Sequence, residues 1–99
     1  MSAEYFPEVV QAVAGPDKTV YVYFSDGRIT QVDMKPSIVS GGVFESLAAD
    51  EFFSGSLTVL NGTVAWDVTG TFDPTKCIDI DPFVAYSAPR VKDPLETVA

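Results

Sequence analysis

The dipeptide Asn61-Gly62 constrains the fold of this chain more than any other feature of its sequence. Asn-Gly readily adopts the positive φ angles of a type I′ turn, and it is a strong local signal for a two-residue β-hairpin. Such a turn sets the register of the flanking strands and pairs residues as follows: Leu60 with Thr63, Val59 with Val64, and Leu57 with Trp66. The side chains of the last two pairs share one face, so we predict an antiparallel hairpin with one apolar side.

A second turn signal, Asp26-Gly27, lies between two further predicted strands. Residues 19–24 alternate valine or phenylalanine with tyrosine, which is the two-residue period of a strand with one buried face. If Asp26 and Gly27 form a two-residue turn, simple pairing places apolar residues of the first strand opposite polar residues of the second strand at the positions farther from the turn. A bulge at Thr30 and Gln31 restores the apolar pairing, so we predict a bulge there.

The rest of the chain supplies one more strand and one helix. Residues 8–14 are rich in valine and alanine and end at a turn cluster, which predicts an N-terminal strand. Asp50 can cap a short helix that extends through Phe53. The predicted fold is therefore α+β: a small, mostly antiparallel sheet built from two hairpins and an N-terminal strand, with one short helix that closes the core together with Phe44 and Leu47.

The chain length of 99 residues predicts a single domain with one modest core. We expect residues 1–7 to form an N-terminal arm and residues 8–86 to form the domain. Residues 87–99 combine prolines with charges of both signs, and we expect them to be a loosely held tail.

The charge of the chain excludes several partners. Fourteen acidic residues and six basic residues give a formal net charge of −8, which repels nucleic-acid phosphates and anionic lipid headgroups. No apolar run approaches the roughly 20 residues that span a bilayer, so a membrane protein is not expected. Cys77 is the single cysteine and the N-terminus does not resemble a secretion signal, which together predict a cytoplasmic location.

The sequence offers little to support catalysis. It contains no histidine, and therefore lacks the usual general base near neutral pH and the commonest metal ligand. Its glycines do not follow the spacing of a phosphate-binding loop, and no other cofactor motif is present. We therefore expect no catalytic residues and no cofactor, and the sequence favours a protein that is not an enzyme.

Four carboxylates near the end of the domain form the alternative candidate site: Asp67, Asp73, Asp79 and Asp81. Carboxylate oxygens bind Ca²⁺ and Mg²⁺, so this group could serve a small enzyme or a divalent-cation-binding protein. The spacing matches no defined metal loop. The simpler interpretation is a terminal strand whose charged side faces water while Ile78 and Ile80 are buried.

Three tyrosines form a candidate partner surface. Tyr21 and Tyr23 lie on the side of their strand opposite the valines, and Tyr86 is a further candidate for the same patch. An exposed aromatic patch would suit a protein partner or a second copy of the chain. The alternative is that a loop or a terminal segment covers it.

Several segments together resemble a known pattern: YFSDGRITQVDMKP, GGVFESL, GTVAWD and CIDIDPFVAY. In this order they are similar to the bacterial family called domain of unknown function 2442, over about residues 8 to 86. The residues that carry the resemblance are Phe24, Asp26-Gly27, Asp33, Pro36, Gly42, Phe44, Leu47, Phe53, Gly62, Trp66, Asp81-Pro82 and Tyr86.

The resemblance implies a small α+β domain without an established catalytic activity. It also implies an arrangement in which some relatives are encoded beside a second small protein, as in toxin–antitoxin pairs. The sequence and the resemblance together favour a non-catalytic protein-interaction module, either as one half of such a two-protein system or as a homodimer.

Overall fold

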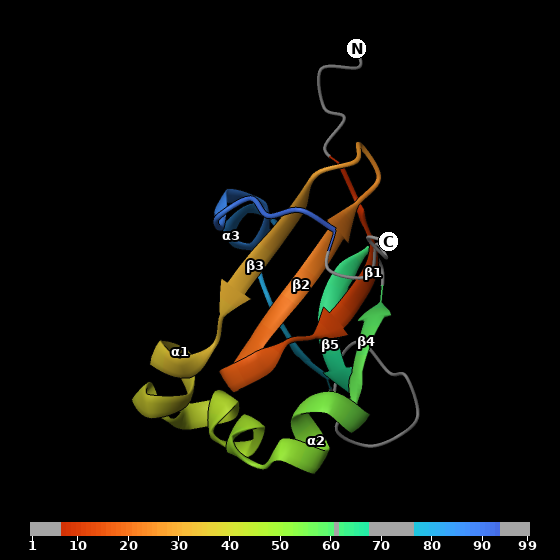
Figure 1. Cartoon of the computed structure of the whole chain (residues 1–99). Helices are drawn as coiled ribbons and strands as arrows, with labels where there is room; N and C mark the ends of the chain where they lie inside the picture. The colour runs from red at the N-terminus through yellow and green to blue at the C-terminus, as the bar shows by residue number, and fades with distance from the viewer. Residues whose placement is uncertain (1–6, 61, 68–76, 94–99) are drawn as a thin grey trace.

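The computed structural model describes residues 7–60, 62–67 and 77–93. In this part of the chain six strands form two antiparallel sheets of three strands each. The first sheet has the order β1-β2-β3, with β1 at Val9–Ala14, β2 at Thr19–Phe24 and β3 at Ile29–Asp33. The second has the order β4-β5-β6, with β4 at Leu57–Leu60, β5 at Thr63–Asp67 and β6 at Cys77–Asp79 (Figure 1). The predicted α+β class is therefore confirmed.

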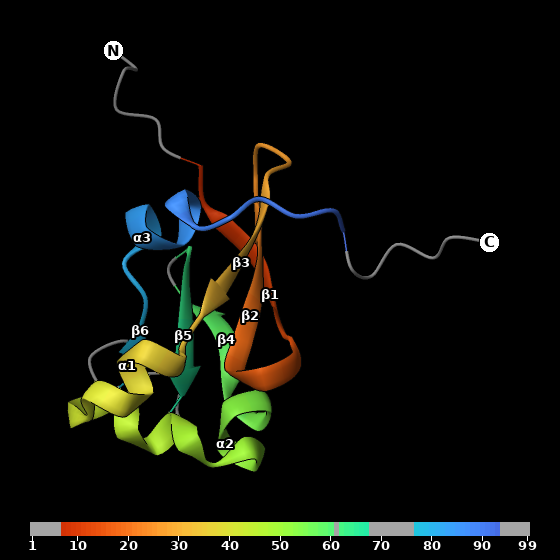
Figure 2. The ribbon, with the colours of Figure 1, turned by 60° about the vertical axis from the view of Figure 1, so that its left-hand side comes forward.

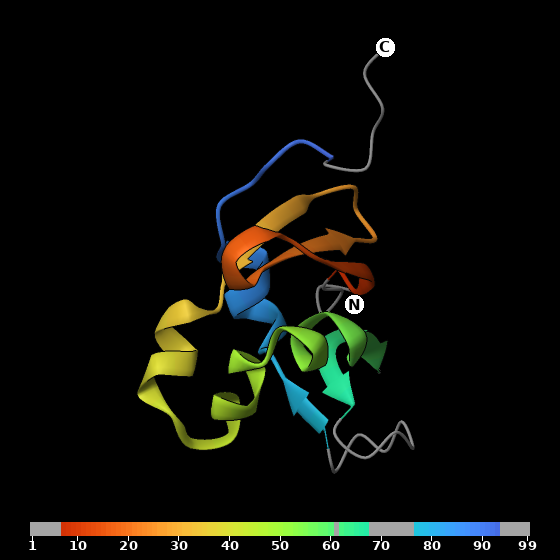
Figure 3. The same cartoon turned by 60° about the horizontal axis from the view of Figure 1, so that its bottom comes forward.

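The described residues contain more helix than the single short helix that the sequence predicted. The α-helices are α1 (Lys35–Ser40), α2 (Asp50–Gly55) and α3 (Pro82–Ser87), and the 3₁₀ segments are η1 (Pro16–Lys18) and η2 (Gly42–Ala48). The predicted helix is α2, although Ala49 rather than Asp50 occupies its N-cap position. The segments α1, η2 and α2 follow one another along one end of the sheets (Figure 1), the end that is turned toward the viewer in Figure 3.

The β4–β5 hairpin has the register that the Asn-Gly turn predicted. The observed pairs are Leu57 with Trp66, Thr58 with Ala65, Val59 with Val64, and Leu60 with Thr63. Gly62 has a φ of 71°, the left-handed conformation that the turn requires, whereas Asn61 lies outside the described residues. Val64 and Trp66 are completely buried, so the apolar side of this hairpin forms part of the core.

The predicted bulge at Thr30 and Gln31 is wrong. Strands β2 and β3 pair without interruption, with Val22 opposite Thr30. The extra residue lies in the turn instead, because the Phe24 amide donates to the Arg28 carbonyl at 2.9 Å and leaves a three-residue loop. Gly27, at a φ of 95°, provides the left-handed position that such a loop needs. A register irregularity does occur in this sheet, but it lies between Val9 and Gln11 in β1.

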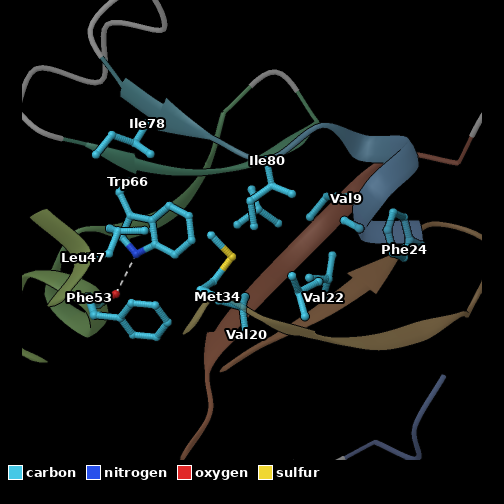
Figure 4. Packing of buried hydrophobic residues seen from close by; sticks show 13 residues of the cluster. Val9, Val20, Val22, Phe24, Met34, Leu47, Phe53, Trp66, Ile78 and Ile80 are labelled. Atoms are coloured by element: carbon cyan, nitrogen blue, oxygen red, sulfur yellow. Dashed lines mark hydrogen bonds between the residues drawn. The ribbon is translucent and has the colours of Figure 1, made fainter. Parts of the chain in front are cut away.

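The hydrophobic core draws side chains from both sheets and from the helical segments (Figure 4). Its buried members are Val9, Val20, Val22, Phe24, Val32, Met34, Leu47, Phe53, Val64, Trp66, Ile78, Ile80 and Ala85. No helix of the described residues is long and apolar enough to cross a membrane.

The segment after α3 lies along the free edge of β3 and crosses the first sheet (Figure 1). The Gln31 amide donates to the Pro89 carbonyl at 2.9 Å, and the Val91 amide donates to the Ile29 carbonyl at 2.9 Å. The beginning of the segment that we expected to be loosely held thus makes backbone hydrogen bonds to the sheet.

Candidate functional site

A hollow of about 280 Å³ opens between β3, the end of β6, and helices α1 and α3. Figure 2 shows α3, β6 and α1 along the same side of the molecule. The hollow is lined by Val32, Asp33, Met34, Ser37, Phe44, Asp79, Ile80, Asp81 and Val84. These residues come from three stretches of the sequence, 32–37, 44 and 79–84, and the fold brings the last of them beside the other two.

The floor of the hollow is apolar. Val32 and Ile80 are 7% and 6% exposed, and Met34 is 3% exposed, so these side chains also belong to the hydrophobic core. Val32 faces inward because it alternates with Asp33 along β3. Phe44 from η2 and Val84 from α3 extend this apolar surface toward solvent.

One side of the rim is formed by Asp33, which is paired with Lys35. The Asp33 carboxylate accepts a hydrogen bond from the Lys35 backbone amide at 2.9 Å and lies 3.1 Å from the Lys35 ammonium. The backbone hydrogen bond and then the ammonium lower the pKa of Asp33. The same ammonium lies 3.2 Å from Asp17, and its contacts with both carboxylates raise the pKa of Lys35. The charge of Lys35 is therefore shared between two acidic side chains.

The other side of the rim is formed by Asp79 and Asp81, which flank the buried Ile80. Both aspartates are exposed, while Ile78 and Ile80 are buried as the sequence predicted. Asp81 also caps α3, because its Oδ1 accepts a hydrogen bond from the Phe83 amide at 2.8 Å. Asp79 forms no ion pair with any residue in the described ranges.

Of the four predicted carboxylates, the structure brings Asp79 and Asp81 to the same hollow, and Asp67 does not line it. Asp67 is only 9% exposed and lies on β5, where it pairs with Cys77 of β6. Asp73 lies outside the described residues. Within residues 7–60, 62–67 and 77–93, no group of three or more histidine, cysteine, aspartate or glutamate side chains is placed to hold a metal ion.

The three candidate tyrosines do not form one patch, because Tyr86 lies on the opposite side of the first sheet from Tyr21 and Tyr23. Tyr23 is half-buried on the outer face of the first sheet, where its hydroxyl donates to Asp93 at 2.7 Å. Tyr86 packs edge-on against Phe24, with ring centroids 4.9 Å apart, and Phe24 points to the opposite, inner face. Tyr21 and Tyr23 thus share a face of β2, and Tyr86 lies apart from them.

Tyr86 belongs to a separate cluster that joins α3 to the β2–β3 loop. Its hydroxyl donates to Asp26 at 2.6 Å, and the Arg28 guanidinium lies 4.2 Å from the centre of its ring. The hydrogen bond lowers the pKa of Asp26 and raises the pKa of Tyr86.

A second hollow, of about 430 Å³, lies beside α2 and the β1–β2 connection. Its charged groups are already paired with one another or with nearby residues. Lys18 forms an ion pair with Asp50 and lies 5.7 Å from the ring centre of Phe53, while Asp17 is bound to Lys35. This hollow therefore offers a ligand less unsatisfied charge than the first.

Exposed apolar side chains lie on the two helices that border the first hollow. Val39 on α1 is 86% exposed, and Phe83 and Val84 on α3 are 65% and 58% exposed. Among the described residues, Val10 is the one other large hydrophobic residue exposed to this degree. The sequence predicts neither helix, and therefore does not identify these exposed residues. The signals were Pro36 and Pro82, since proline is favoured in the first turn of a helix.

The fold and this hollow define a small α+β domain with an apolar recess rimmed by carboxylates. Residues 9–87 match the model of a family described as "Protein of unknown function (DUF2442)". The chain belongs to this family, as its sequence indicated. Comparisons with curated proteins and with solved structures gave no significant match. Three of the residues that carried the resemblance line the hollow: Asp33, Phe44 and Asp81.

Proposed function

We propose that this protein is a non-catalytic interaction module that binds a basic protein through the α1/α3 face, which comprises Val39, Phe83, Val84 and the hollow. The observation that carries the proposal is that three of the four strongly exposed large hydrophobic side chains of the described residues lie on the two helices bordering that hollow. Each Å² of apolar area left in water forgoes about 25 cal/mol of stabilisation by burial, so exposed apolar side chains on the two helices that border one hollow favour a docking role.

Charge favours a basic protein over a second copy of the chain as the partner. The net charge of the chain is −8, and two copies would bring like charges together. The carboxylates of Asp33, Asp79 and Asp81 line the same hollow, and Lys35 is already shared between Asp33 and Asp17. A positively charged surface would complement this face and speed its association with the module.

The absence of histidine from the sequence supports a binding role over a catalytic one. The residues that line the hollow offer carboxylates, one hydroxyl and apolar side chains, without an arginine, lysine or cysteine among them. The family resemblance adds the proposal that the partner is the second member of a two-protein system. A cytoplasmic setting suits such a pair.

The experiment compares three tagged versions of the full chain in lysate of the source organism. They are the wild type, Phe83→Ser/Val84→Ser, and the matched control Val10→Ser, which removes an exposed valine from β1. At about 150 mM salt, screening suppresses loose ionic association. We expect wild type and Val10→Ser to retain one stoichiometric basic protein, identified by mass spectrometry, and the double variant to retain at least about tenfold less.

Circular dichroism and the melting temperature establish that each variant is folded before the comparison. Equal retention of the partner by the double variant and the control would overturn the assignment of the α1/α3 face. A wild-type chain that captures no protein and scatters light as a monomer at micromolar concentration would overturn the interaction module itself.

A further inference from the structure

We propose that the hollow receives the side chain of a single lysine or arginine of the partner, an inference that rests on the proposed function. In this arrangement the methylene stem lies on the apolar floor and the charged group lies at the carboxylate rim. The inference specifies both the class of ligand and the residues that select it.

The size of the hollow suits one long side chain. Pockets for drug-sized molecules and cofactors typically occupy about 300–1,000 Å³. The hollow, at about 280 Å³, falls just below that range. It is also open to solvent between the exposed Val84 and the exposed aspartates, so a side chain can enter from the surface of a docked protein.

The arrangement of apolar and charged side chains in the hollow favours a ligand that combines an alkyl chain with a positive charge. Lysine and arginine characteristically bury their methylene stems along apolar surface while the charged end stays at a polar boundary. Here Val32, Met34 and Ile80 provide the buried apolar surface, and the flanking carboxylates provide the boundary. A neutral apolar group would use the floor alone and would partly remove water from the carboxylates without compensation.

The rim carries more negative charge than its neighbours neutralise. Asp81 uses one oxygen to cap α3, which fixes the carboxylate at the mouth of the hollow. Asp79 has no ion pair within the described ranges, and the ammonium of Lys35 is divided between Asp33 and Asp17. A partner ammonium or guanidinium would thus gain charge-assisted hydrogen bonds that no described residue of this chain supplies.

A divalent metal ion fits the same place less well. Ca²⁺ and Mg²⁺ require six or more oxygen ligands converging on one point. The apolar floor provides none of them, and the described residues contain no group of three or more histidine, cysteine, aspartate or glutamate side chains that could hold a metal ion. The long cationic side chain uses both the floor and the rim.

The test is a titration of the ¹⁵N-labelled full chain, followed by amide chemical shifts, with n-butylammonium and n-butylguanidinium as probes. Matched probes are n-butanol, which keeps the stem without the charge, and ammonium, which keeps the charge without the stem. We expect saturable shifts at residues 32–34, 37, 44, 79–81, 83 and 84 with the two butyl cations, at millimolar concentrations. The two matched probes should bind at least about fivefold more weakly.

The variant Asp79→Asn/Asp81→Asn removes two rim charges, and asparagine retains the capping ability that α3 needs. We expect it to bind n-butylammonium about fivefold more weakly than the wild type. The control Glu8→Gln/Glu51→Gln removes the same charge from exposed positions outside the hollow and should bind as the wild type does. Equal binding of n-butanol, shifts centred elsewhere, or equal weakening in both double variants would overturn the inference.

The same variants separate this inference from the proposed function. If the butyl cations bind in the hollow and lysate yields no basic partner, the proposed function fails while the hollow remains an alkyl-cation site. If Asp79→Asn/Asp81→Asn retains the partner as the wild type does, the interaction module stands and the role of the hollow is overturned.

Discussion

The indole nitrogen of Trp66 donates a hydrogen bond to the backbone carbonyl of Phe53 at 2.8 Å (Figure 4). Phe53 lies in the last turn of α2, where carbonyl groups lack partners within the helix. The two rings also contact each other, with centroids 5.5 Å apart. A single side chain therefore attaches α2 to β5 and satisfies a polar group that the short helix leaves unpaired.

Replacing Trp66 by Phe should lower the free energy of unfolding by about 2–4 kcal/mol, because the change opens a cavity and leaves the Phe53 carbonyl without its donor. Urea denaturation followed by circular dichroism measures this loss. Val10→Ser, an exposed substitution, should fall within about 0.5 kcal/mol of the wild type. A similarly small loss for Trp66→Phe would contradict the role assigned to the hydrogen bond.

Thr30 attaches α3 to the first sheet through a comparable hydrogen bond. Its hydroxyl is buried and donates to the Ala85 carbonyl at 2.8 Å. Thr30→Val keeps the shape of the side chain but removes the donor, and should destabilise the fold by about 1–2 kcal/mol. Thr58→Val changes a half-buried threonine of β4 and serves as the control. If the two variants unfold at the same urea concentration, the hydrogen bond does not stabilise α3.

Tyr86→Phe should lower the melting temperature in a pH-dependent manner. The Tyr86 hydrogen bond holds the pKa of Asp26 below its ordinary value of 3.8, so its contribution is present above that value and is lost as the pH falls through the folded pKa. The bond also raises the pKa of Tyr86 above 10.0, so the contribution is lost again as the pH rises through that raised value. Thermal unfolding at a series of pH values should show the largest difference between these limits. A difference that persists unchanged in acid would contradict this assignment.

The sequence predicted the β4–β5 hairpin because the turn chemistry of Asn61-Gly62 and the flanking apolar alternation agree on one register. It did not predict the length of the Asp26-Gly27 loop. A two-residue turn and a three-residue turn with glycine in the left-handed position share the same local signal, and the packing of Val22 beside Thr30 decides between them.

Helices α1 and α3 escaped prediction because six residues are too few to establish a helical period. The sequence predicts a terminal strand around Ile78 and Ile80 and no helix after it, whereas Asp81 caps α3 and Pro82 begins it. The candidate site depends on these helices. The sequence identified Asp79 and Asp81 as notable carboxylates and Ile80 as buried, but the other two floor residues, Val32 and Met34, are brought near them only by tertiary packing.

Millimolar Ca²⁺, Mg²⁺ or Mn²⁺ should leave the melting temperature unchanged. Specific binding to the native state would raise it, but Asp67 does not line the hollow, and the described residues contain no group of three or more histidine, cysteine, aspartate or glutamate side chains that could hold a metal ion. Thermal shift measurements with and without chelator test this expectation. A rise of several degrees that disappears in Asp79→Asn/Asp81→Asn would favour the divalent-cation alternative instead.

The most direct test of the central claim is hydrogen–deuterium exchange of the chain, free and bound to its purified partner. The interaction module predicts slower exchange in α1 and α3, at residues 35–40 and 82–87, with little change in β1 and β2. The opposite result would be slower exchange in β1 and β2, the strands on the side of Tyr21 and Tyr23, with no change in the two helices. That result would contradict docking at the α1/α3 face.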